Sequence, residues 1–124
     1  MHVTSGTGLC GNWDEMIIVG WTDGRVTALD IEEGGLVWSA QTEVVNWGIT
    51  GSLALDNDSV VVPTRQGLSR FCLSDGTENL RVDLPQLGWR NGVTVIEDSY
   101  LLGNEEGIIN IVSKTGEISN ITVG

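Results

Sequence analysis

The chain has 124 residues, the length of one modest domain, and its 17 acidic and 6 basic residues give a formal net charge of −11. Such an acidic surface repels nucleic acid and anionic membranes, so we expect neither as a partner. No apolar run approaches the length of a membrane span, and Met1–Leu9 lacks the basic start and apolar stretch of a signal peptide. The compartment stays open: cytoplasmic or, if an N-terminal part is missing, extracellular.

The composition favours an all-β fold. The chain has 17 Gly, 2 Pro and many Val, Ile and Thr residues, which suit short strands joined by frequent turns. No stretch shows the apolar spacing and capping residues of a helix. The acid-rich, lysine-poor composition is similar to that of halophilic archaeal proteins, and an ordinary acidic protein is the alternative.

The sequence predicts three units of four strands. The first unit is built around Ile17–Trp38, where Thr22, Asp23 and Gly24 supply a turn between an apolar run and the alternating segment Arg25–Asp30. In chain order, the expected strands are Thr7–Gly11, Met16–Gly20, Arg25–Asp30 and Leu36–Ala40, then Ile49–Leu55, Ser59–Pro63, Leu68–Leu73 and Glu78–Asp83, and finally Gly92–Ile96, Ser99–Gly103, Ile108–Val112 and Glu117–Thr122.

Matching landmarks mark the three units as repeats. The turn glycines Gly24, Gly67 and Gly107 lie 43 and 40 residues apart. Each is preceded by a short apolar run and an acidic turn, and followed by a second glycine turn at Gly34, Gly76 and Gly116. A period of this size decides the fold.

A four-stranded antiparallel meander repeated about every 40 residues is typical of a β-propeller blade. We divide the chain into blades at residues 1–47, 48–88 and 89–124. Blades pack face to face, which explains the apolar residues on both faces of Val60–Val62. Because closed propellers typically have 4–8 blades, three blades predict a partial or open propeller. Its partners would be other blades, from a longer parent chain or by self-association.

The first unit resembles the repeat of the PQQ-like (quinoprotein-like) β-propellers. The matching residues are Asp23-Gly24, Ala28-Leu29-Asp30, Gly34 and Trp38. The second unit keeps Gln66-Gly67 and Ser74-Asp75-Gly76, and the third keeps Gly107 and Lys114-Thr115-Gly116. The resemblance implies that Trp38 docks between adjacent blades, a place taken by Arg81 in the second unit and Asn120 in the third.

The resemblance implies a binding role without catalysis. Quinone-dependent dehydrogenases of this fold use adjacent cysteines and a calcium site of Glu, Asn and Asp. The sequence has no Cys-Cys pair and no stretch that matches this calcium site. We therefore expect no catalytic residue, no cofactor and no resident metal.

Tryptophans are the candidate binding residues. Five tryptophans are many for a chain of this length. Packing between blades fits Trp38 best because of its place in the repeat. Trp21, Trp47 and Trp89 lie near strand ends or links, so they are either core residues or an exposed platform for a partner.

Other polar groups give weaker indications. Cys10 and Cys72 lie at non-matching places in different units, so we expect two free thiols. His2 is the only histidine, which argues against a His-based triad or zinc site. The sequence Asp56-Asn57-Asp58 fits a hairpin turn, with a calcium site as the alternative. Asp23, Glu105 and Glu106 lie at matching turns and suit a solvated surface.

Three functions fit these sequence features. The first is a non-enzymatic binding scaffold made of PQQ-like blades, with a protein partner. The second is part of a quinone-dependent dehydrogenase whose catalytic residues lie outside these 124 residues. The third is a sensor module of a larger receptor or kinase.

Overall fold

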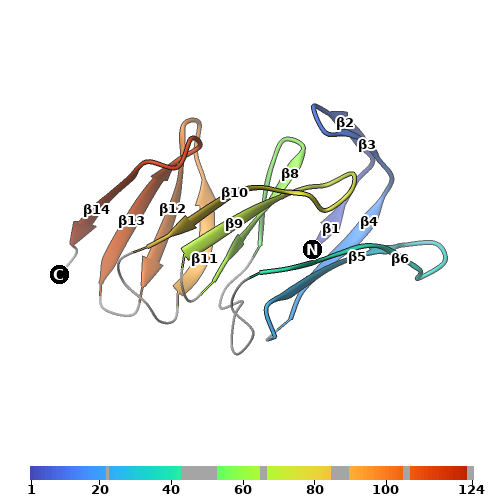
Figure 1. Cartoon of the computed structure of the whole chain (residues 1–124), viewed down its shortest axis with the longest axis horizontal. Helices are drawn as coiled ribbons and strands as arrows, with labels where there is room; N and C mark the ends of the chain where they lie inside the picture. The colour runs from blue at the N-terminus through green and yellow to red at the C-terminus, as the bar shows by residue number, and fades with distance from the viewer. Residues whose placement is uncertain (22, 43–52, 65–66, 85–89, 105–106, 123–124) are drawn as a thin grey trace.

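The computed structural model describes residues 1–21, 23–42, 53–64, 67–84, 90–104 and 107–122, which form strands and turns without a helix (Figure 1). The predicted all-β fold of consecutive antiparallel sheets is therefore confirmed. Within these residues, no helix is present that could cross a membrane.

Three four-stranded antiparallel sheets follow one another along the chain, and we call them blades 1, 2 and 3. In Figure 1 they stand next to each other, with blade 1 at the right and blade 3 at the left. Blade 1 has the order β1-β4-β5-β6, blade 2 the order β7-β8-β9-β10 and blade 3 the order β11-β12-β13-β14. Blade 1 consists of β1 (His2–Val3), β4 (Met16–Gly20), β5 (Arg25–Asp30) and β6 (Leu36–Gln41). Blade 2 consists of β7 (Ala54–Asp56), β8 (Ser59–Pro63), β9 (Gly67–Cys72) and β10 (Glu78–Asp83). Blade 3 consists of β11 (Arg90–Val95), β12 (Ser99–Asn104), β13 (Ile108–Ser113) and β14 (Ile118–Thr122).

The first predicted strand, Thr7–Gly11, is wrong. β1 pairs with β4 instead, and the residues between them form a separate hairpin of β2 (Gly6–Gly8) and β3 (Gly11–Trp13). Burial explains the choice, because Val3 is buried in the core whereas the segment Gly6–Gly8 has no apolar side chain to place there. The predicted strand Ile49–Leu55 lies partly outside the described residues, and β7 begins at Ala54.

The landmark glycines serve two different purposes. Gly24 and Gly107 have φ of 83° and 80°, a left-handed conformation that glycine adopts without strain. Gly67 instead lies in β9, where a Cβ atom would come within 1.8 Å of the carbonyl oxygen of Val82. The same repeat position is therefore glycine for turn geometry in blades 1 and 3, and for close backbone approach in blade 2.

The seam between blades 1 and 2, which we call the first seam, is apolar. Its buried residues from blade 1 include Met16, Ile18 and Trp38, and those from blade 2 include Val60 and Phe71. The Trp38 indole is 6% exposed and donates from Nε1 to the carbonyl of Leu73 at 2.8 Å. The prediction that Trp38 is buried between the first two units is confirmed.

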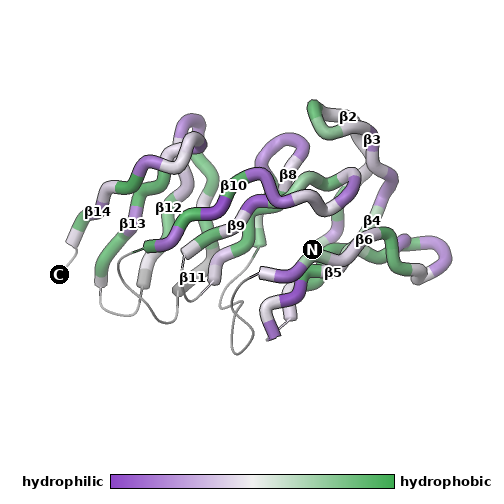
Figure 2. Tube along the Cα trace, in the orientation of Figure 1, coloured by the Kyte–Doolittle hydropathy of each residue, from purple (hydrophilic) through white to green (hydrophobic). Residues whose placement is uncertain are grey.

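The seam between blades 2 and 3, the second seam, has its own core. Val61, Leu68 and Val82 from blade 2 meet Tyr100, Leu102 and Val112 from blade 3. Figure 2 shows hydrophobic residues in the strands of all three blades, with hydrophilic residues at several turns and along β10. Both seams are therefore built by face-to-face packing of sheets, as the repeats predict.

Pairing register places Leu80, not Arg81, at the Trp38 position of blade 2. Trp38 pairs with Ala28 on β5, and Leu80 pairs with Arg70 on β9. Each then approaches a turn glycine of the next blade: a Cβ on Gly76 would lie 2.5 Å from the Trp38 ring, and one on Gly116 would lie 3.6 Å from Leu80. In blade 3 the same register gives Ser119, opposite Ile111, in place of Asn120.

Candidate functional site

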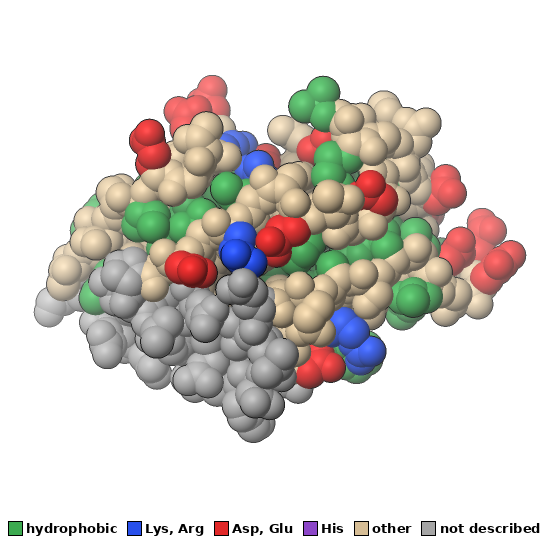
Figure 3. All heavy atoms as spheres, in the orientation of Figure 1, with side chains coloured by type: hydrophobic (Ala, Val, Ile, Leu, Met, Phe, Trp, Pro, Cys, Tyr) green, Lys and Arg blue, Asp and Glu red, His purple; other side chains and the backbone are tan. Residues whose placement is uncertain are grey.

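The outer face of blade 1, the face turned away from blade 2, is an exposed apolar surface. Antiparallel partners share a face, so this face carries Ile17 with Leu29 and Leu36 opposite Leu29. Ile17 is 39% exposed and Leu36 is 63% exposed. In Figure 3 many of the acidic side chains stand at the edges of the view, and hydrophobic side chains reach the surface between the polar ones. This face is the first candidate for binding a partner.

Trp21 extends the same face at the end of β4. Its Nε1 donates to Thr27 Oγ1 at 2.9 Å, and the guanidinium carbon of Arg25 lies 5.3 Å from the ring centroid. These contacts hold the indole in place while 43% of the residue stays exposed. The geometry suits a rigid aromatic platform. The other predicted platform residues, Trp47 and Trp89, lie outside the described residues.

The outer face of blade 3 is also apolar. Leu101 pairs with Ile111 and Ile109 pairs with Ile121, which puts all four on the face turned away from blade 2. Ile121 is 52% exposed and the other three are half-buried. The chain therefore presents an apolar sheet face at each end of its stack of blades.

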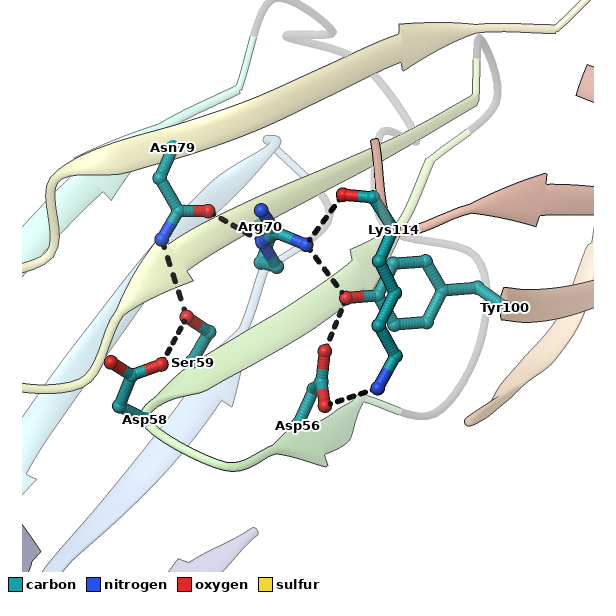
Figure 4. Close-up of polar contacts among 7 residues, drawn as sticks. All are labelled: Asp56, Asp58, Ser59, Arg70, Asn79, Tyr100 and Lys114. Atoms are coloured by element: carbon teal, nitrogen blue, oxygen red, sulfur yellow. Dashed lines mark hydrogen bonds and ion pairs between the residues drawn. The ribbon is translucent and has the colours of Figure 1, made fainter. Parts of the chain in front are cut away.

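A polar network that was not predicted from the sequence crosses the second seam (Figure 4). Lys114 Nζ donates to Asp56 Oδ1 at 2.9 Å, and the Tyr100 hydroxyl donates to the other oxygen of Asp56. Arg70 donates to the Tyr100 hydroxyl at 2.8 Å and to the carbonyl of Lys114 at 3.2 Å. Its Nε donates to Asn79 Oδ1 at 2.6 Å. The network joins β7 and β9 of blade 2 to β12 and the turn after β13 of blade 3.

Burial and partners set the protonation of this network. Burial and the hydrogen bond to Asp56 raise the pKa of Tyr100 to about 12, although Arg70 opposes the shift. Burial also raises the pKa of Asp56, but hydrogen bonds from Tyr100 and Lys114 and the charges of Lys114 and Arg70 outweigh it, so that pKa lies below its ordinary value. At neutral pH, the network holds an ionised Asp56 against a neutral Tyr100 and two cations.

The structure places Asp56-Asn57-Asp58 in the β7–β8 hairpin, with Asn57 in the left-handed region at φ 53°. Asp56 is occupied by Lys114 and Tyr100, and Asp58 accepts from the Leu9 amide at 2.8 Å and from Ser59. A pocket of about 250 Å³ lies beside them, lined by both aspartates together with Arg70 and Asn79. Among the described residues, no group of three or more acidic, histidine or cysteine side chains could hold a metal ion.

The prediction of two free thiols is wrong, because Cys10 and Cys72 form a disulfide with a Cα–Cα distance of 6.0 Å. The β2–β3 hairpin leans from blade 1 onto blade 2, which brings the β2–β3 turn to the end of β9. Ser74 Oγ donates to the Cys10 carbonyl at 2.9 Å, which fixes the hairpin further. Spacing within the repeat could not reveal the pairing, because the hairpin is an insertion into the blade pattern.

Neither a protein-family model nor a curated protein matches the chain. Solved structures do match it. BamB from Moraxella catarrhalis is similar over 99% of this chain and 39% of its own, with a TM-score of 0.71 and 19% identity. The computationally designed Ika8 protein is similar over 90% of this chain and 37% of its own, with a TM-score of 0.62 and 22% identity. The computationally designed Ika4 protein is similar over 90% of this chain and 62% of its own, with a TM-score of 0.55 and 20% identity.

The chain spans less than two thirds of each of these structures. At such identities the similarity shows the fold alone. Together with the three stacked sheets, it shows that this chain has the fold of a run of β-propeller blades.

Proposed function

We propose that the chain is a non-enzymatic binding scaffold of PQQ-like blades that engages a protein partner through its exposed blade faces. The observation that carries the proposal is the outer face of blade 1, where Ile17, Trp21 and Leu36 are each more than one third exposed. Exposed apolar faces of this kind are typical of interaction sites. The assignment to the PQQ-like repeats is supported by Asp23-Gly24, Ala28-Leu29-Asp30 and Trp38. The acidic, lysine-poor composition supports a halophilic source.

The disulfide supports an oxidising compartment, since such bonds persist outside the reducing cytosol. We infer that the scaffold works there. The Cys10–Cys72 bond and the Leu9–Asp58 hydrogen bond then keep blades 1 and 2 in a fixed orientation, which lowers the entropy cost of presenting a binding face.

A selection with random peptides displayed on phage tests the scaffold role. We expect enrichment of apolar, β-prone peptides, because an extended or flat apolar segment suits an open sheet face. Binding should fall at least tenfold in Ile17→Glu and stay unchanged in Leu9→Glu, a matched change at the exposed turn of the hairpin. Absence of enrichment, or equal binding by both variants, would contradict the proposal.

A titration with pyrroloquinoline quinone and calcium separates the scaffold from a dehydrogenase. The scaffold proposal expects no specific binding, because the sequence has neither the Cys-Cys pair nor a matching calcium site. Stoichiometric, calcium-dependent binding to this chain would favour the dehydrogenase alternative instead. A sensor module of a larger receptor would behave as a scaffold in both experiments.

A further inference from the structure

We infer that the partner at the outer faces is a second copy of this chain, with blade 3 of one copy stacked on blade 1 of the next. The inference rests on the proposed scaffold function and names its partner. We compare each outer face with a seam inside the chain, using residues at equivalent strand positions of the blades. These seams are the established interfaces, and the proposed contact continues the stack.

Blade 1 carries the receiving half of a seam on its outer face. In blade 2, Val60 and Phe71 pair across β8 and β9 and pack against blade 1 with at most 1% exposure. The same positions in blade 1 are Ile17 and Leu29, which pair across β4 and β5. Their side chains are apolar in both blades, but only those of blade 2 are covered within the chain.

A glycine turn gives a second, independent match. Gly76 and Gly116 each receive the side chain of the preceding blade, Trp38 in the first case and Leu80 in the second. The equivalent turn of blade 1 contains Gly34, with φ of 71°, and a Cβ there would meet nothing within 4 Å. Blade 1 therefore has the docking turn of a seam without a neighbour in it.

Blade 3 carries the donating half. In blade 2, Leu68 and Val82 pair across β9 and β10 and are buried against blade 3. The same positions in blade 3 are Ile109 and Ile121, which also pair across the third and fourth strands. Their face carries apolar pairs at Leu101–Ile111 and Ile109–Ile121, while Ser119 stands opposite Ile111.

The apolar strand positions of both halves of one seam are thus present on a single chain, with Ser119 at the position that Trp38 has in blade 1, so the contact requires no other molecule. Its two sides are different surfaces, which makes it a head-to-tail contact that closes into a ring or grows, depending on the angle between copies. The net charge of −11 opposes association at low salt. Salt screens that repulsion, because the Debye length falls from about 10 Å at 0.1 M to about 3 Å at 1 M.

Sedimentation of the purified chain in 0.1 M and 2 M potassium chloride tests the inference. We expect concentration-dependent oligomers that become tighter at high salt. Ile17→Glu in the blade 1 face and Ile121→Glu in the blade 3 face should each weaken association at least tenfold. Leu9→Glu, the control with the same charge change outside both faces, should associate like the parent.

Mixing the two face variants is the decisive experiment. One variant keeps an intact blade 3 face and the other an intact blade 1 face, so an equimolar mixture should restore one head-to-tail contact and give a heterodimer. If either variant fails to fold by circular dichroism, Leu36→Glu and Ser119→Glu replace them on the same two faces.

Three outcomes would overturn the inference: a monomer at all concentrations and salts, association that neither variant weakens, or a mixture that stays monomeric. A monomer that still binds selected peptides through Ile17 would leave the scaffold function standing and refute only self-association. Failure of both experiments would refute both proposals.

Discussion

The two seams solve the same packing problem with different chemistry. The first seam is apolar, with the Trp38 ring against Gly76 and a disulfide fixing the hairpin above it. The second places the smaller Leu80 near Gly116 and adds the network of Asp56, Tyr100, Arg70 and Lys114. The difference shows that the repeat determines where blades pack against each other, while individual side chains determine how stable each seam is.

Asn110 sharpens the contrast. It lies in β13 on the face of Val112, fully buried in the second seam, and neither polar atom of its side chain has a hydrogen-bond partner within the described structure. A buried amide without partners costs about 1–3 kcal/mol. The first seam, by comparison, gives its buried indole nitrogen a partner at the Leu73 carbonyl.

We expect the strongest destabilisation at the centre of the first seam. Trp38→Ala should lower the free energy of unfolding by about 3–5 kcal/mol, because a large buried side chain is removed and leaves a cavity. Leu80→Ala at the equivalent place should cost less, below about 2 kcal/mol, since Leu80 is only half-buried. Urea unfolding followed by far-ultraviolet circular dichroism measures both. Equal losses would mean that the two seams do not differ at this position.

The disulfide comes next. Cys10→Ala should lower the free energy of unfolding by about 2–5 kcal/mol, because it removes a disulfide between residues 62 apart in sequence. Thiol counting on the denatured, unreduced parent should find none per chain, and the same count after reduction should find two. Two thiols before reduction would contradict the Cys10–Cys72 disulfide and leave the first seam without a covalent bond.

Asn110→Leu should have the opposite sign. Replacing the unpartnered amide by an apolar side chain should raise the free energy of unfolding by about 1–3 kcal/mol. Asn120→Leu is the matched control, because Asn120 pairs with Asn110 across β13 and β14 but is exposed, and it should change stability by about 0.5 kcal/mol or less. A destabilised Asn110→Leu variant would indicate that the amide has a partner after all.

The smallest effect concerns the Tyr100 hydroxyl. Tyr100→Phe should cost about 1 kcal/mol, the net contribution of a typical hydrogen bond, since Asp56 keeps Lys114 as a partner. The folded-state pKa of Tyr100 is raised from 10.0 to about 12, so its contribution is complete below pH 10 and is lost as pH rises to about 12. Asp56 behaves in the opposite way: its lowered pKa gives stability above pH 3.8 that is lost on further acidification.

Melting temperatures measured from pH 8 to 12 for the parent and Tyr100→Phe test this assignment. The parent should lose stability more steeply than the variant between pH 10 and 12. Parallel curves would show that Tyr100 does not titrate within the second seam.

The strands and turns of each blade follow from local sequence patterns. Alternating residues in Arg25–Asp30 and turn glycines recurring at about 40-residue spacing predict strands and turns locally, and the observed second, third and fourth strands of each blade match the prediction closely. Burial of Trp38 followed from its place in the repeat. These features depend on neighbours along the chain, which a sequence displays directly.

The contacts between blades became visible in the three-dimensional structure. The Cys10–Cys72 bond, the Asp56–Tyr100 contact and the hairpin at Gly6–Trp13 join residues from different units or break the repeat. The position of Leu80 also emerged only from the pairing register, one residue away from the predicted Arg81. In a sheet, a shift of one residue moves a side chain to the other face, so the composition of a seam depends on a register that the spacing of turn glycines does not fix.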